Sequence, residues 1–193
     1  VLEHYESYSY HLVVQRIHNF CVNQLGGVYL DIIKDRQYTT QQNSEIRRSA
    51  QTAMKLMIDK LVVLVAPILS FTAEEIWQND ADLKANKASV FLAELDSIPD
   101  FDSNLDHECW SRLLEIKDNV NQKIEESRNA GEIKGSLDTN IELTVNTSDF
   151  QLLNNLSTEL HFFFIVSSCN LVQGDDLEVR IKQSTFKKCT RCW

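Results

Sequence analysis

Residues 20–38 constrain the fold of this chain more than any other stretch. They join the end of one apolar helical stripe to a second run whose apolar residues recur every three or four positions: Val28, Tyr29, Ile32 and Ile33. Residues at this spacing share one face of a helix, so both runs predict amphipathic helices. Gly26 and Gly27 lie between the runs and are costly inside a helix. The sequence therefore predicts a helix over residues 6–25, a break, and a second helix ending near Asp35.

Local signals predict two further helices in the first half of the chain. Ser44 is a candidate N-cap for a third helix, which Pro67 ends because proline cannot continue a helix. Thr72 and Glu75 have the spacing of a capping box, which predicts a fourth helix starting at Ala73 with Ile76 and Trp77 turned inward. Residues 80–87 are polar, and the apolar residues 90–92 are expected to pack back on the helices.

The composition changes over residues 96–106, where a proline and several aspartates predict a linker. A long helix is expected from Asp106 to about Asn129, ended by Gly131. Apolar and polar residues alternate over 141–146 and 177–182, the pattern of half-exposed strands. A short helix is expected over 150–156 and a buried strand over 160–166. The predicted fold class is mainly α, a helical bundle followed by a small α+β domain.

Three runs carry a family resemblance. Residues 29–38 read YLDIIKDRQY, residues 47–53 read RRSAQTA, and residues 66–77 read APILSFTAEEIW. In this order the runs resemble the anticodon-binding domain of class I aminoacyl-tRNA synthetases, most closely that of the bacterial-type isoleucyl-tRNA synthetases. The resemblance implies a helical anticodon-binding domain over 1–98, an α+β domain over 99–186, and a truncated zinc module over 187–193. The chain is then expected to be a C-terminal piece of a longer protein.

The net charge of −9 argues against a simple nucleic-acid binder, but the charge is unevenly distributed. Residues 1–70 carry seven Lys/Arg and six Asp/Glu, so the acidity belongs to the remainder. A protein that is acidic overall can still present a local basic face. The candidates for tRNA contact lie at the two ends of one loop: Lys34, Arg36, Arg47 and Arg48.

Two interpretations of these four cations stay open. They can converge on a phosphate backbone, or they can be solvated helix-end residues neutralised by nearby carboxylates: Asp31, Asp35 and Glu45. Unpaired anticodon bases would be read by stacking and by hydrogen bonds to their edges. Tyr38, Trp110 and Trp193 are candidate stacking platforms, although core packing is the favoured role of Trp110.

The chain contains five cysteines at no disulfide-like spacing, which favours a reducing cytosol and a cytoplasmic protein. Cys21 and Cys169 lie in apolar surroundings and are expected to fill core space. Cys189 and Cys192 form a C-x-x-C, which is half of a tetrahedral metal site and also the spacing of a redox pair. The resemblance implies a structural zinc site of four thiolates completed by a second pair, which this sequence lacks, so we expect no bound zinc here.

No catalytic motif is found in the sequence. By resemblance, the parent protein attaches isoleucine to its tRNA with ATP and Mg, in a catalytic domain outside this chain. The expected partners are isoleucine tRNA and the rest of the synthetase, with no membrane and a monomeric state. Two alternatives remain: an acidic helical protein-interaction module, and the equivalent domain of a valyl- or leucyl-tRNA synthetase.

Overall fold

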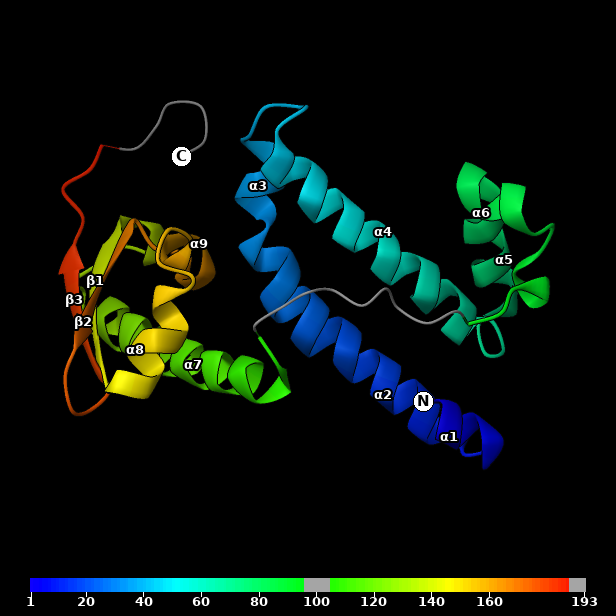
Figure 1. The fold of residues 1–193 in the computed structure, drawn as a ribbon, viewed down its shortest axis with the longest axis horizontal. Coiled ribbons are helices and arrows are strands. Elements are labelled where there is room, and N and C mark those ends of the chain that lie inside the picture. Colours follow the sequence, from blue (N-terminus) through cyan, green and yellow to red (C-terminus); the bar gives the residue numbers. More distant parts are fainter. Residues whose placement is uncertain (96–104, 188–193) are drawn as a thin grey trace. The chain divides into compact units, whose positions relative to one another are not determined.

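The computed structural model describes residues 1–95 and 105–187 (Figure 1). The chain divides into two compact units, Val1–Phe101 and Asp102–Trp193, and each is described by itself. The predicted domain boundary at residue 98 and most of the predicted linker over 96–106 lie outside the described residues, so the boundary stays a prediction. The described elements confirm the fold class, mainly α with a small α+β part.

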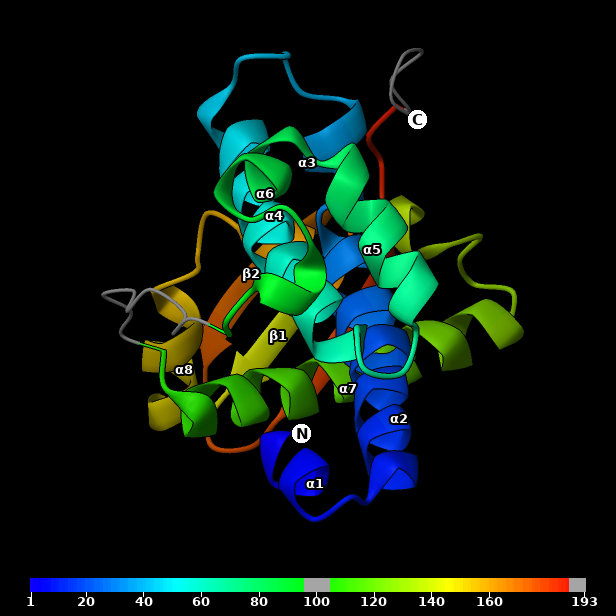
Figure 2. The ribbon, with the colours of Figure 1, turned by 90° about the vertical axis from the view of Figure 1, so that its right-hand side faces the viewer.

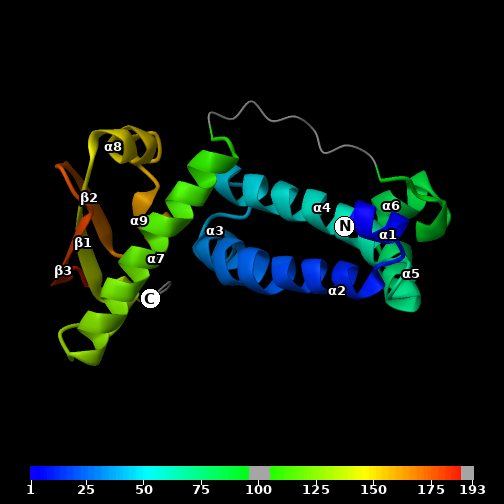
Figure 3. The ribbon, with the colours of Figure 1, turned by 90° about the horizontal axis from the view of Figure 1, so that it is seen from below.

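The first unit is a long helical hairpin with a small cap of helices. Figures 1 and 3 show α2 and α4 side by side, with α3 where the chain turns from one to the other. In Figure 2, α1 lies at the opposite end of the hairpin from α3. The elements are α1 (Leu2–Glu6), α2 (Tyr10–Asn19), the π-helix η1 (Phe20–Leu30), α3 (Lys34–Tyr38), α4 (Glu45–Val65), α5 (Ser70–Asn79), α6 (Ala81–Asn86) and the 3₁₀ turn η2 (Val90–Leu92).

The predicted helix break at Gly26 and Gly27 was wrong, because η1 runs through both glycines. A π-helix brings each residue close to the carbonyl five positions earlier. A Cβ on Gly26 would lie 3.0 Å from the Cys21 carbonyl oxygen, and one on Gly27 would lie 3.3 Å from that of Val22. The glycines therefore permit this close backbone approach. The second predicted helix also ends later, at Tyr38, so the basic residues near 34–36 lie within α3.

The predicted start of the third helix is confirmed, and that of the fourth was wrong. The Ser44 side chain accepts a hydrogen bond from the Arg47 backbone N–H at 3.4 Å, and α4 ends at Val65, just before Pro67. The next helix, α5, begins at Ser70, so Thr72 lies inside it. The chain turns from α4 directly into α5, and the Ser70 hydroxyl donates to the Ala66 carbonyl at 3.0 Å. Because of this tight connection, α5 begins two residues before Thr72, the predicted cap.

The far end of the hairpin holds a compact apolar cluster: Val62, Ala66, Ala73, Trp77, Leu83 and Val90. The indole N–H of Trp77 donates to the Lys87 carbonyl at 2.8 Å. Of the pair expected to point inward, Trp77 is 4% exposed, whereas Ile76 is 36% exposed. Residues 90–92 pack back only through Val90, since Phe91 and Leu92 are exposed.

The polar stretch 80–87 contains a helix that the sequence reading missed, α6. The Asp80 carboxylate caps it by accepting from the backbone N–H groups of Asp82 and Leu83, each at 3.0 Å. Leu83 then reaches the apolar cluster. A single apolar anchor gives no periodic pattern, which explains why composition alone read this stretch as irregular.

The second unit is a three-stranded sheet covered on one face by helices (Figures 1 and 3). The strand order is β2-β1-β3, with β1 parallel to β2 and antiparallel to β3. The alternating apolar residues of β1 are buried, as predicted: Ile141, Leu143 and Val145. The elements are α7 (His107–Asn129), η3 (Ser136–Asp138), β1 (Thr139–Val145), α8 (Thr147–Asn154), α9 (Leu160–Phe164), β2 (Ser168–Gln173) and β3 (Glu178–Gln183).

Signals at both ends of α7 acted as predicted. The Asp106 carboxylate accepts from the Cys109 backbone N–H at 2.8 Å, and Gly131 takes a left-handed φ of 77° just after the helix. The predicted buried strand over 160–166 was wrong, because these residues form α9. Ile165 adopts a left-handed φ of 56° and ends that helix. A short continuous apolar run carries no period that distinguishes a helix from a strand.

Among the residues that the structure describes, no helix has the length and apolar character needed to cross a membrane.

Candidate nucleic-acid interface

The basic residues predicted from the sequence gather where α3 turns into α4, which we call the α3–α4 corner: Lys34, Arg36, Arg47 and Arg48. Lys34 and Arg36 belong to the short helix α3, and Arg47 and Arg48 to the first turn of α4. Helices α3 and α4 pack against each other, so the turn brings both pairs to one end of the hairpin. The sequence could place these cations together only if the two ends of the loop approached each other, and the packing of α3 against α4 brings the ends together.

Lys34 is engaged in an ion pair on the surface. Its Nζ lies 2.5 Å from Asp31 Oδ1, and the two side chains are 65% and 41% exposed. The hydrogen bond to Asp31, followed by the charge of that carboxylate, raises the pKa of Lys34. Surface pairs of this kind contribute little to stability, so a phosphate could compete with Asp31 for this ammonium group. One of the neutralising pairs considered from the sequence is therefore present.

Arg47 and Arg48 differ from Lys34, because neither has a carboxylate partner within the described part of the chain. Arg48 is exposed and lines a shallow hollow of about 470 Å³ with four residues of the loop and of α4: Asn43, Glu45, Ser49 and Thr52. Arg47 is half-buried, and its Nε is buried with no hydrogen-bond acceptor among the described residues. A buried donor without an acceptor is unfavourable, so the Arg47 guanidinium is not satisfied by the described residues alone.

The candidate stacking platforms have different surroundings. Tyr38, the last residue of α3, is 83% exposed. Trp110 is 44% exposed, so the expectation that it packs in the core was wrong. Trp193 lies outside the described residues.

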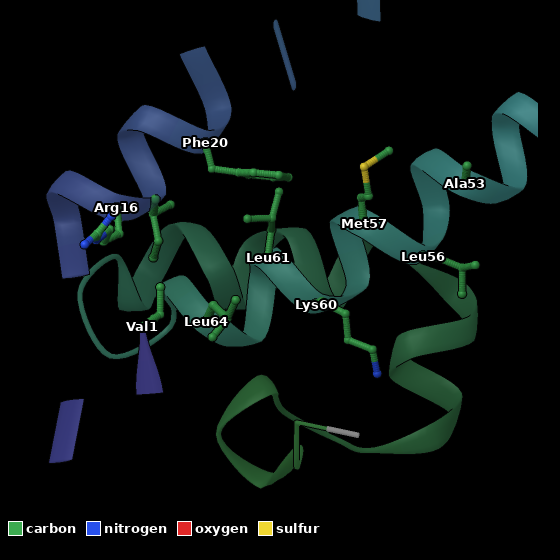
Figure 4. Close-up of a pocket in the computed structure, with 10 residues that line it drawn as sticks. Val1, Arg16, Phe20, Ala53, Leu56, Met57, Lys60, Leu61 and Leu64 are labelled. Carbon is green, nitrogen blue, oxygen red and sulfur yellow. The ribbon is translucent and has the colours of Figure 1, made fainter. Parts of the chain in front are cut away.

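The first unit also carries an apolar groove that the sequence reading did not identify (Figure 4). It has a volume of about 410 Å³ and is formed by α2, η1 and α4. Most of its lining is apolar: Val1, Ile17, Phe20, Ala53, Leu56, Met57, Leu61 and Leu64. Arg16 and Lys60 complete the lining. Contiguous apolar surface rimmed by polar residues marks interaction sites.

The groove escaped the sequence reading for a physical reason. Leu56, Met57, Leu61 and Leu64 recur at helical spacing, which is equally the pattern of a buried helix face. Only the three-dimensional arrangement shows that the described elements of the first unit leave a groove open between α2, η1 and α4.

The second unit holds buried charges that serve its packing. The Arg112 guanidinium forms a two-point hydrogen bond with the Asp149 carboxylate, at 3.0 Å from Nε and 2.7 Å from Nη2. These bonds join α7 to α8, and hydrogen bonding from Arg112 lowers the pKa of Asp149. Lys117 is 4% exposed and donates its Nζ to the Phe163 carbonyl at 2.5 Å, which joins α7 to α9.

The predicted zinc half-site, Cys189 and Cys192, lies outside the described residues. Within residues 1–95 and 105–187, no group of three or more His, Cys, Asp or Glu side chains is arranged to hold a metal ion. Cys21 and Cys169 are half-buried, and burial raises the pKa of the Cys169 thiol to about 12. A thiol with so high a pKa is unreactive at neutral pH, which fits a packing role.

Comparisons with known proteins agree with the resemblance seen in the sequence. A family model described as the anticodon-binding domain of tRNA ligase matches residues 1–143. A protein of Teredinibacter turnerae named isoleucine–tRNA ligase is 42% identical, and the alignment covers 98% of this chain and 22% of that protein. Proteins with the same name from Saccharophagus degradans and Dichelobacter nodosus are 40% and 42% identical, and 22% and 20% of them are covered. The chain thus spans about a fifth of the length of these relatives.

Proposed function

Because the chain belongs to the family of anticodon-binding domains of tRNA ligases, we propose that it binds the anticodon stem-loop of an isoleucine tRNA. The relatives named isoleucine–tRNA ligase extend over nearly the whole chain, which favours isoleucine over valine or leucine as the amino acid of the parent enzyme. The same comparisons favour tRNA binding over the alternative of an acidic protein-interaction module.

The observation that carries the proposal is the α3–α4 corner. It presents four cations, and two of them, Arg47 and Arg48, have no carboxylate partner in the described part of the chain. Phosphate contacts set the register of a protein on RNA and supply most of the salt-dependent affinity. A local excess of positive charge on an acidic protein allows RNA to approach from this side while the acidic remainder disfavours other orientations.

The mechanism of the proposed function is positional. Phosphate contacts at the corner hold the stem-loop, and the unpaired anticodon bases are distinguished by stacking and by hydrogen bonds to their edges. In the full-length protein this grip orients the tRNA so that its acceptor end reaches a catalytic domain elsewhere in the chain. The whole protein is then an isoleucine–tRNA ligase that uses ATP and Mg and acts as a monomer in the cytoplasm. Cys189 and Cys192 supply half of a four-thiolate zinc site.

Binding to isoleucine tRNA at several salt concentrations tests the proposal. We expect affinity to fall as salt rises, and an anticodon-swapped version of the same tRNA to bind more weakly. Arg48→Glu should weaken binding roughly tenfold and reduce the slope of log K against log salt by about one. Lys84→Glu makes a similar charge change on an exposed lysine of α6, at the other end of α4, and should leave binding nearly unchanged. Equal effects of the two variants would show that only the net charge matters.

The apolar groove supports a second role for the first unit, contact with the rest of the parent protein. About four-fifths of the relatives' length lies outside the matched region, and this length is available to supply a covering segment. We propose that an apolar segment of the full-length chain occupies the groove, with acidic residues placed to meet Arg16 and Lys60. An apolar fluorescent dye should bind the 193-residue chain and be excluded from the full-length protein. Equal dye binding by both would refute this role and leave the tRNA proposal untouched.

A further inference from the structure

Tyr38 is the most exposed tyrosine of the first unit, at 83% against 78% for Tyr8, and it differs from the other tyrosines in its contacts. The hydroxyl of Tyr5 donates to the Leu64 carbonyl at 2.6 Å, and that of Tyr29 to the Ala50 carbonyl at 3.4 Å. Tyr8 and Tyr10 pair edge to face, with ring centroids 6.3 Å apart. Tyr38 is 83% exposed, with no hydrogen bond or ring contact within the described part of the chain. Folding of this unit therefore gives no reason for an aromatic residue here.

The backbone that carries Tyr38 is held in place. The Thr39 hydroxyl donates to the Asp35 carbonyl at 2.6 Å, and the Thr40 hydroxyl to the Arg36 carbonyl at 2.5 Å. These bonds satisfy two carbonyls at the end of α3 and fix the turn that follows Tyr38. The exposed ring consequently projects from a preorganised position, which reduces the entropy lost when it makes a contact.

Two exposed cations belong to the same corner as Tyr38, and Asp35, three residues before Tyr38 on α3, is the nearest acidic residue in the sequence. Lys34 precedes Tyr38 by four residues, so both side chains lie on one face of α3. Lys34 is itself 65% exposed, and Arg48 is exposed at the start of α4. An aromatic face beside exposed cations is the combination that binds unpaired nucleotides, because bases stack on the ring while phosphates meet the charges.

We propose that Tyr38 is a stacking platform for one unpaired nucleotide of the bound RNA, with Lys34 contacting the adjoining phosphate. The proposal rests on the proposed tRNA-binding function and adds to it a specific residue that contacts a base. We expect the two residues to contribute differently to RNA affinity. Tyr38 contributes affinity that salt does not screen. Lys34 contributes affinity that falls as salt rises, because its contact releases counterions.

The test measures binding of the 193-residue chain to an anticodon stem-loop RNA that carries the fluorescent base 2-aminopurine at single loop positions. Tyr38→Ala should weaken binding about 5- to 100-fold, the effect of losing one stacked base, with an unchanged salt slope. Tyr38→Trp should restore affinity, and one loop position should lose its quenching in Tyr38→Ala alone. Lys34→Ala should instead reduce the salt slope.

Phe71→Ala is the matched control. Phe71 is 93% exposed on α5, but its neighbours one turn later are Glu74 and Glu75, so this aromatic surface repels phosphate. We expect RNA affinity within twofold of the wild type. If Tyr38→Ala binds as well as the wild type while Arg48→Glu binds weakly, the stacking proposal fails and the proposed function stands. If the wild type shows no salt-dependent RNA binding at all, both fail.

Discussion

The two compact units differ in how many of their apolar side chains they bury. Within the described residues, the second unit buries thirteen apolar side chains and leaves three large ones exposed: Trp110, Leu137 and Phe186. The first unit buries nine and exposes sixteen, so its apolar surface is mostly left uncovered. The second unit therefore has the larger apolar core, whereas the first unit leaves more of its large apolar side chains exposed.

This difference explains where binding features occur. The α3–α4 corner and the apolar groove both belong to the first unit. The buried charges of the second unit are instead used internally, to join α7 to α8 and α9. A region that keeps apolar and charged surface exposed has fewer buried contacts, so we expect the first unit to open locally more easily than the second.

The largest effect should come from the core of the second unit. Leu143 is fully buried in the central strand β1. Leu143→Ala should lower the free energy of unfolding of this unit by about 2–5 kcal/mol, because it removes buried methyl groups and leaves a cavity. Hydrogen exchange measured along a urea series should show earlier unfolding of β1 and an unchanged transition for α4. Simultaneous unfolding of both segments would break the comparison, because it would mean that the units fold as one.

The next effect concerns the Arg112–Asp149 pair. Asp149→Asn keeps the shape of the side chain but removes the charge-assisted bonds, so we expect a loss of about 1–3 kcal/mol at pH 7. Because the folded-state pKa of Asp149 is lowered, its contribution is present above its unfolded pKa of about 4 and is lost as pH falls through the folded value. The difference in stability between the wild type and Asp149→Asn should therefore shrink as the pH falls below about 4. Urea unfolding at pH 7 and pH 3 measures this, and parallel curves would contradict it.

A smaller effect is expected in the groove of the first unit. Leu61 lines the groove and is only partly buried. Leu61→Gln should change the free energy of unfolding by no more than about 1 kcal/mol in this chain, since little apolar area is removed from water there. Binding of an apolar fluorescent dye should fall in the same variant. A loss as large as that of Leu143→Ala would show that α4 is packed as firmly as β1, and the contrast between the units would disappear.

Signals that act within one turn of a helix were predicted well from the sequence. Ser44 caps α4 and Gly131 takes the left-handed conformation after α7, because each effect depends only on nearby backbone groups. The α3–α4 corner was also foreseen, since a short loop between two helices brings their ends together. Whether Lys34 would pair with Asp31 was left open, and the sequence alone cannot choose a side-chain partner.

Features that depend on distant or unusual contacts were not predicted. Residues 160–166 form a nearly continuous apolar run that gave no period, and the helix is decided by packing against α7 and β2. The groove is formed by α2, η1 and α4, and α4 is distant from the other two in the sequence, so no local pattern predicts it. The glycine pair was read by its helix propensity, whereas the structure uses it for a hydrogen-bonding register five residues apart.

That glycine pair gives the smallest and most discriminating prediction. In Gly26→Ala, two effects oppose each other: alanine favours helix over glycine by about 1 kcal/mol, but its Cβ would lie 3.0 Å from the Cys21 carbonyl oxygen. A backbone oxygen cannot move aside as a flexible side chain can, so the backbone of η1 should shift to relieve the contact. We expect a net stability change within about 1 kcal/mol, together with a rotation of α3 that weakens RNA binding.

Urea unfolding and tRNA binding of Gly26→Ala measure the two effects separately, and Gly135→Ala supplies the control. Gly135 has an extended φ of −174°, and an added Cβ there meets no atom within 4 Å, so neither property should change. In the first unit, a substitution would then change the free energy of unfolding little but weaken RNA binding. In the second unit, core substitutions should instead lower the free energy of unfolding. A Gly26→Ala variant that is more stable and binds RNA fully would show that the π-helix plays no part in placing the α3–α4 corner.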